Sequence, residues 1–291
     1  MHARTLAAAL LLVGGCDLVD ETVVTELSGP SSALAVSMDG AVVWTTQGSG
    51  DLTLVPRDAQ TGEVLNQIGP WTESWAIRSL YKSYEDGHED EVWVMHHNGF
   101  RTRWGVDGIA TDAEETLPNS QSPWGDRVFC DFARDLDGVT YLLIQEWYGK
   151  IMLVRDDGGD LTWAELSNPD GSTSMCGPMD FDLGAQQVAV QGWTSLGWKV
   201  LRWFDPDALT VEYEQTSQGF YGNDFRAFGH RTVDSGLGLR IFDESGQLSA
   251  DSDFANGYGV DLHFANNVAQ VWWSGQETPQ SPNLLGHHDL Q

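Results

Sequence analysis

The chain has 291 residues, and its 15 Lys and Arg stand against 43 Asp and Glu, which gives a formal net charge of −28 at pH 7. Nucleic-acid binding requires a basic face that neutralises phosphates, so this balance excludes nucleic acid as a partner. We interpret the excess of carboxylates as a solvated acidic surface like that of proteins from saline habitats, with calcium loading as the alternative interpretation.

The N-terminus has the layout of a secretory signal. His2 and Arg4 precede an apolar run from Leu6 to Val13, which is too short to cross a bilayer. The segment Leu-Val-Gly-Gly-Cys that ends at Cys16 then resembles the lipobox of bacterial lipoproteins. In that family the signal peptide is cut before the cysteine, whose thiol receives a diacylglycerol and whose amine is acylated.

The resemblance implies that residues 1–15 are a signal peptide and that Cys16 carries acyl chains such as palmitate. Several chains on one residue would anchor the protein stably to a membrane of the bacterial cell envelope, whereas one chain binds only marginally. An ordinary signal peptide with an incidental cysteine is the alternative. The choice between inner membrane, outer membrane and cell surface stays open, because the sorting signal that Asp17 resembles varies between lineages.

Beyond the N-terminus the chain repeats. Four aspartates, each closing a short apolar stretch and opening a Gly- or Pro-rich turn, stand 49 residues apart, and a fifth follows after 38: Asp58, Asp107, Asp156, Asp205 and Asp243. Self-similarity at 40 to 50 residues is typical of propellers and solenoids. The aspartates themselves are interpreted as turn residues that end a strand.

A second marker in the same phase defines the repeat unit. Runs rich in Val, Ile, Trp and Tyr, which favour strands, alternate with turn signals such as Asn98-Gly99. Each unit reads as four strands, and the first strands of six units lie near Val36, Ile77, Phe132, Phe181, Phe225 and Leu262. We therefore predict an all-β fold in which residues 31–291 form a β-propeller of six four-stranded blades; seven blades, one of them degenerate, is the alternative.

Ring closure requires one more strand, because the last unit stops early, over Leu284 to Gln291. Residues 16–30 are expected to form a lipidated tether. Within that tether, Val23 to Leu27 is predicted to supply the outer strand of the last blade.

One segment resembles a known family. Leu52 to Leu65 reads Leu-Thr-Leu-Val-Pro-Arg-Asp-Ala-Gln-Thr-Gly-Glu-Val-Leu and resembles the blade element of quinoprotein-like propellers, in which a strand ends in Asp-x-x-Thr-Gly. The match covers one unit of six, and the cofactor ligands of the quinone enzymes cannot be carried over. The family also includes lipoprotein propellers that act as scaffolds in outer-membrane protein assembly, so the resemblance implies a binding role.

The acidic residues of the predicted first strands are the candidate metal ligands. Asp131, Asp180, Asp224 and Asp261 share one phase, and four carboxylates around a propeller axis would attract a divalent cation. Six-bladed lactonases, which hold calcium axially, resemble this plan, but the set lacks the amide ligands of that family and no general base can be named. The alternative is that each Asp fastens a loop to its own strand by accepting hydrogen bonds from backbone amides.

Two cysteines remain after Cys16, and both are predicted where innermost strands of adjacent blades begin. An exported protein permits a disulfide, so a bridge between Cys130 and Cys176 is one expectation and two buried small residues the other. No nucleophile motif of the Gly-x-Ser-x-Gly type occurs.

The sequence therefore favours a non-catalytic binding or scaffold module for a protein or an envelope glycan. Trp71, Trp75 and Trp124 are the candidate contacts, because they precede or begin units where loops emerge. No cofactor is expected. A calcium-dependent lactonase or esterase is the alternative function.

Overall fold

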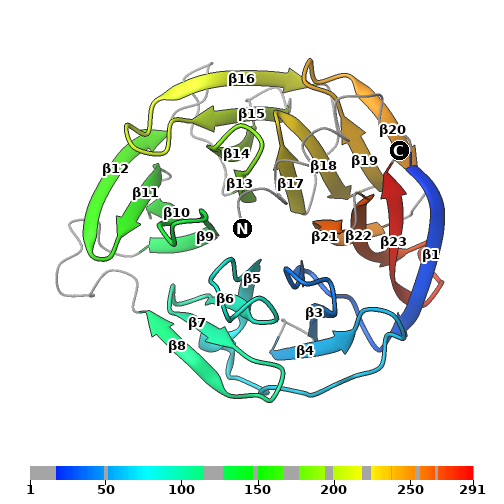
Figure 1. Ribbon diagram of the computed structural model, residues 1–291. Coiled ribbons are helices and arrows are strands. Elements are labelled where there is room, and N and C mark those ends of the chain that lie inside the picture. Colours follow the sequence, from blue (N-terminus) through cyan, green and yellow to red (C-terminus); the bar gives the residue numbers. More distant parts are fainter. Residues whose placement is uncertain are drawn as a thin grey trace.

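A computed structural model describes residues 18–48, 52–114, 127–146, 150–166, 177–193, 199–217, 224–236, 238–252, 256–265 and 268–290. Six antiparallel sheets surround a central axis, and each sheet is one blade of a β-propeller (Figure 1). The all-β fold and the six blades are thus confirmed. Within the described residues, no helix is both long and apolar enough to cross a membrane.

The innermost strand of each blade lies at the predicted first-strand marker. These strands are β2 (Leu34–Val36), β5 (Ile77–Lys82), β9 (Arg127–Arg134), β13 (Met179–Asp182), β17 (Asp224–Phe228) and β21 (Asn256–Ala265). The second strands, which pair with them, are β3 (Val42–Gln47), β6 (Val92–His96), β10 (Thr140–Glu146), β14 (Gln187–Trp193), β18 (Arg231–Gly236) and β22 (Val268–Gln276).

The third strands end at or near the evenly spaced aspartates. They are β4 (Thr53–Asp58), β7 (Arg101–Trp104), β11 (Ile151–Asp157), β15 (Lys199–Phe204), β19 (Gly238–Phe242) and β23 (Asn283–Leu290). Four blades continue to an outer strand, which is β8 (Ala110–Glu114), β12 (Asp160–Leu166), β16 (Val211–Ser217) or β20 (Leu248–Ser252).

The first blade has no regular fourth strand. The chain after β4 returns along it through two isolated bridges, Arg57 with Val64 and Leu54 with Ile68, before the short 3₁₀ turn η2 (Glu73–Trp75) leads into β5. The four-strand unit predicted from the sequence is thus reduced in this blade to three strands and two bridges. The returning segment carries Pro70, which has no N–H to donate to a ladder.

The N-terminal strand β1 (Leu18–Leu27) closes the ring by pairing with β23, from Leu18 opposite Leu290 to Leu27 opposite Asn283. Figure 1 shows it on the outer rim, beside the C-terminal strand. The predicted closing strand, Val23 to Leu27, is confirmed, and it begins five residues earlier than expected.

The turn aspartates act as predicted. Asp58 Oδ1 accepts hydrogen bonds from the backbone N–H groups of Gln60 and Thr61 at 3.0 and 2.8 Å. Asp205 Oδ1 binds the N–H groups of Asp207 and Ala208 in the same way. An aspartate at this position therefore satisfies backbone donors that the end of the third strand leaves unpaired.

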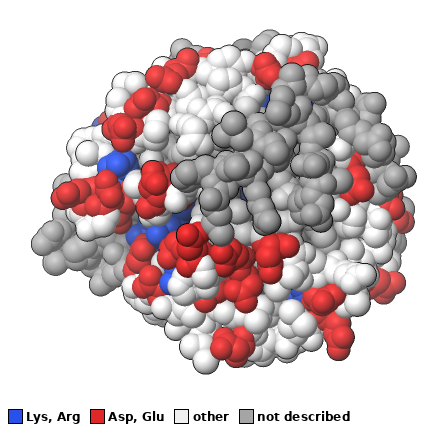
Figure 2. Space-filling model, viewed as in Figure 1, with Lys and Arg blue, Asp and Glu red and all other residues white. Residues whose placement is uncertain are grey.

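Aromatic rings and basic side chains both lie in the interior of the propeller. Trp44, Trp93, Trp203 and Trp273 are at most 2% exposed and pack in the apolar core. Between the second and third blades, the guanidinium of Arg134 lies 4.2 Å from the centre of the Trp93 ring. Basic side chains such as Arg134 are thus buried, whereas many acidic residues lie on the face seen in Figure 2.

Candidate functional site

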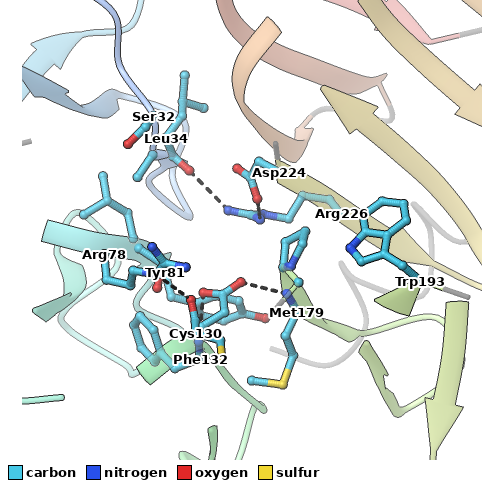
Figure 3. Close-up of a pocket in the computed structure, with 16 residues that line it drawn as sticks. Ser32, Leu34, Arg78, Tyr81, Cys130, Phe132, Met179, Trp193, Asp224 and Arg226 are labelled. Atoms are coloured by element: carbon cyan, nitrogen blue, oxygen red, sulfur yellow. Dashed lines mark hydrogen bonds and ion pairs between the residues drawn. The ribbon is translucent and has the colours of Figure 1, made fainter. Parts of the chain in front are cut away.

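All six inner strands begin on the same face of the propeller, which we call the entry face, and a cavity of about 310 Å³ opens there at the axis. Its lining comes from the first residues of several inner strands, among them Leu34 of β2, Arg78 of β5 and Asp224 of β17. Figure 3 shows these side chains converging from different blades. The cavity is the candidate functional site because clefts of this kind are where small ligands bind.

The four inner-strand aspartates connect the blades. The Oδ2 atom of each accepts a hydrogen bond from a backbone N–H of the following blade: Asp131 from Met179 at 2.7 Å, Asp180 from Ala227 at 2.8 Å, Asp224 from Val260 at 3.1 Å, and Asp261 from Val36 at 2.7 Å. Asp131 and Asp224 also bind the next N–H of their own strand. The aspartates thus bind backbone amides, as in the sequence-based alternative, but these bonds fasten one blade to the next and not a loop to its own strand.

Two basic side chains lie among these carboxylates. Arg226 of β17 donates from Nε to Asp261 Oδ1 at 3.0 Å and from Nη1 to Asp224 Oδ1 at 2.9 Å. Lys82, at the end of β5, has its Nζ atom 2.8 Å from Asp261 Oδ2. Buried charges are tolerated when they are paired and hydrogen-bonded, and these contacts provide both conditions.

Burial is the largest influence on the pKa values of the four inner-strand aspartates. It raises the pKa of Asp180 to about 7 and that of Asp224 to about 6, although Arg226 acts in the opposite direction on both. Burial also raises the pKa of Asp131. Burial acts in the same direction on Asp261, but Lys82 and Arg226 outweigh it and lower the pKa of that carboxyl.

The hydroxyl of Tyr81 completes the axial network. It donates a hydrogen bond to Asp180 Oδ1 at 3.1 Å, from the second blade to the fourth. Burial holds the pKa of Tyr81 well above its usual value, so the phenol keeps its proton. Both oxygens of Asp180 are therefore occupied, one by a phenol and one by a backbone amide.

The four predicted calcium ligands already have hydrogen-bond partners in the protein, and two of them also form ion pairs. With four carboxylates, Lys82 and Arg226, the formal charge of the axial group is 2 − 4 = −2, so an incoming cation would compete with two resident ones. In the part of the chain that the structure describes, no group of three or more His, Cys, Asp or Glu is arranged to hold a metal ion. The carboxylates thus do not fit a metal centre as they stand, and calcium binding stays a prediction.

Two of the three predicted tryptophans come together on the entry face. Trp75 lies two residues before the start of the inner strand β5, and its ring centre is 5.3 Å from that of His96 and 5.2 Å from that of Phe100. Trp71 packs against the same His96 at 5.2 Å. Trp75 is 37% exposed. Trp124 lies outside the described residues.

The cluster has a fixed geometry. The imidazole Nδ1 of His96 lies 2.7 Å from the carbonyl oxygen of Trp75, and Nε2 lies 3.1 Å from Oγ1 of Thr102. Burial lowers the pKa of His96, so the ring is neutral at pH 7. Trp75 is therefore a partly exposed ring on a rigid support, next to the strand that brings Arg78 to the cavity.

The cysteines can be described only in part. Cys130 is buried, lines the cavity and is disulfide-bonded. Cys16 and Cys176 lie outside the described residues, so the pairing of Cys130 with Cys176 stays a prediction. Gly177 and Pro178, which follow Cys176 in the sequence, line the same cavity as Cys130, in agreement with that pairing.

Comparison with known proteins supports the fold. No family model and no curated protein matches the chain. Among solved structures, the WD40 domain of Pan2 from Neurospora crassa is similar, with a TM-score of 0.55 and 12% sequence identity. The match covers 94% of this chain and 96% of that one. At this identity, the likeness shows a shared β-propeller fold alone.

Sequence reasoning missed the residues that neutralise and complete the axis, which are Lys82, Arg226 and Tyr81, and it missed Arg78 at the cavity. A signal for the cations was present. The chain has few basic residues, and a Lys or Arg inside a predicted innermost strand faces a crowded interior, where a carboxylate partner is needed.

Proposed function

We propose that this propeller is a non-catalytic binding module, and that its partner, a protein or an envelope glycan, contacts the entry face. A propeller fold suits such a role because rigid blades hold the loops of one face in fixed positions. The observation that carries the proposal is the partly exposed Trp75, held by His96 beside the axial cavity. Aromatic anchors on rigid supports are typical of binding surfaces.

Calcium-dependent hydrolysis is not part of the proposal. Such an enzyme would need axial carboxylates available to a metal ion and a base to activate water. Instead, the four carboxylates hold backbone amides of neighbouring blades, and Arg226 and Lys82 lie among them. These contacts support a structural role for the axial group.

We further propose that Cys16 anchors the protein to a membrane of the bacterial cell envelope. One residue separates Cys16 from Leu18, the first residue of β1. Leu18 pairs with Leu290, which itself pairs with Ala269 at the start of the second strand β22, so this end of β1 lies on the face opposite the entry face. A lipid on Cys16 would therefore leave the cavity and Trp75 facing away from the membrane.

The binding role is tested by capturing partners from envelope extracts with the full-length protein and with Trp75→Ala. Truncation of an aromatic anchor costs about 2 to 4 kcal/mol of binding free energy. We therefore expect the yield of a specific partner to fall at least about tenfold in the variant. The matched control is Trp163→Ala, which removes a 53% exposed tryptophan from the outer strand β12. Equal loss in both variants, or capture unaffected by Trp75→Ala, would contradict a partner site on the entry face.

A further inference from the structure

The axial cavity contains a positive charge that the ion pairs of the fold do not use. Arg78 lies on β5 with an exposed side chain, and its Nε atom donates to the carbonyl oxygen of Cys130 at 2.8 Å. No carboxylate in the described ranges forms an ion pair with it, although Asp and Glu outnumber Lys and Arg by 43 to 15. Its two terminal nitrogens are thus directed to no acidic side chain of the described fold.

The carboxylates of the same cavity are already engaged. Asp131 accepts from the N–H groups of Phe132 and Met179, and Asp224 binds Arg226 as well as Val260. The lining holds two aspartates and two arginines, so its formal charge is 2 − 2 = 0, against −28 for the whole chain. An anion therefore meets less repulsion here than over the acidic surface.

Apolar side chains form much of the remaining wall. Phe132 and Trp193 are 1% and 7% exposed, and Leu34 and Met179 lie beside them in the lining. Figure 3 shows Arg78 and Trp193 on opposite sides of the cavity. The volume of about 310 Å³ suits a compact organic molecule, at the lower end of the range for ligand sites.

We propose that the axial cavity binds a small carboxylate with an aromatic or other apolar body. The carboxylate pairs with the terminal nitrogens of Arg78, whose planar fork matches two carboxylate oxygens. The apolar body lies toward Trp193 and Met179. This inference deepens the proposed function by naming a ligand class for the entry face, and it rests on that function only for the use of this face.

The test measures binding of N-acetyl-phenylalanine and of its neutral amide to the full-length protein by calorimetry. These probes have the same shape and differ in the carboxylate. We expect the acid to bind one to one and at least about tenfold more tightly than the amide, which corresponds to about 1.4 kcal/mol. Equal affinity for the two probes, or a dissociation constant for the acid above about 10 mM, overturns the proposal.

Variants assign the effect to Arg78. Arg78→Gln should remove the preference for the acid, whereas Arg78→Lys, which keeps the charge, should retain part of it. Arg202→Gln makes the same charge change on β15, outside the cavity, and should bind both probes as the unaltered protein does. A preference that persists in Arg78→Gln, with its thermal unfolding unchanged, contradicts the proposal. Loss of partner capture in Trp75→Ala is a separate result, because that variant leaves Arg78 in place.

Discussion

At the residue scale, the inner-strand aspartates act across blade boundaries. Each carboxylate accepts a hydrogen bond from the backbone of the next blade, and a bond to a charged acceptor is worth about 1.5 to 3 kcal/mol. The cost is burial of negative charge, which Arg226 and Lys82 offset most fully at Asp261. Asp180 has no such direct ion pair and depends on Tyr81 and Ala227.

Asp180 should therefore make stability depend on pH. Its pKa is about 7 in the fold against an ordinary 3.8, so between these values the folded state holds more protons than the unfolded state. The free energy of unfolding consequently falls as pH rises through this range. Asp180→Asn cannot ionise and keeps an oxygen for the Ala227 amide. Between about pH 5 and 7, we expect the free energy of unfolding to fall by about 2 kcal/mol less in this variant than in the unaltered protein.

The measurement is urea unfolding at a series of pH values. Asp207→Asn removes one charge from a side chain that is 86% exposed, and it controls for the change in net charge. A slope in Asp180→Asn equal to that of the unaltered protein would show that the carboxyl of Asp180 keeps an ordinary pKa in the fold.

At the element scale, strands and turns follow from local chemistry. Asp58 and Asp205 bind amides within three residues of themselves, so their roles can be read from the sequence near them. The axial contacts cannot be read in this way. The pair of Arg226 with Asp261 joins two adjacent blades, and the bond from Tyr81 to Asp180 joins the second and fourth blades, so both depend on how the blades close.

The closing strand β1 could be predicted from the sequence in part. Its pattern predicts a strand, but its pairing with β23 joins the two ends of the propeller. Val24 packs against the cluster that contains Leu27 and Leu285, whereas its neighbour Val23 is 46% exposed. The register is irregular here, because Val23 lies opposite Gly286 and Thr25 opposite Leu285, with Val24 between them. At this irregularity the side chain of Val24 faces the apolar cluster and that of Val23 faces solvent.

This arrangement predicts opposite outcomes for two adjacent substitutions. Val24→Asp places a charge against the apolar cluster and should lower the free energy of unfolding by about 2 to 4 kcal/mol. Val23→Asp places the same charge in water and should change it by no more than about 0.5 kcal/mol. Thermal or urea unfolding measures both. Similar losses in the two variants would mean that the side chains of Val23 and Val24 do not differ in burial as described.

At the scale of the whole molecule, the two faces of the propeller differ in their connections. The entry face bears the cavity with Arg78 and the supported ring of Trp75, and β1 begins on the opposite face at Leu18. Many cations of the chain are buried, and two of them, Arg101 and Lys199, form ion pairs between blades at 1% exposure or less. The acidic exterior is thus left largely without basic neighbours, which favours a solvated surface.

A lipid on Cys16 would fix how the propeller faces the membrane. Only one residue would separate the lipid from Leu18, so the propeller would be held close to the bilayer. Expressed with residues 1–15 in a bacterial host, the unaltered protein should sediment with membranes and require detergent for release. Cys16→Ser should move it to the soluble fraction, since a protein with no acyl chain loses about 0.8 kcal/mol of binding for every methylene that would be buried. Cys130→Ser removes a disulfide-bonded cysteine from the cavity wall but leaves Cys16 in place, so this variant should stay with the membranes. If Cys16→Ser still requires detergent, the attachment does not pass through this residue, and no end of β1 is fixed relative to the membrane. If Cys16→Ser is released, a membrane-impermeant reagent should label the entry face of the unaltered, anchored protein at least as readily as the face at Leu18, because the short tether would leave the cavity facing away from the bilayer.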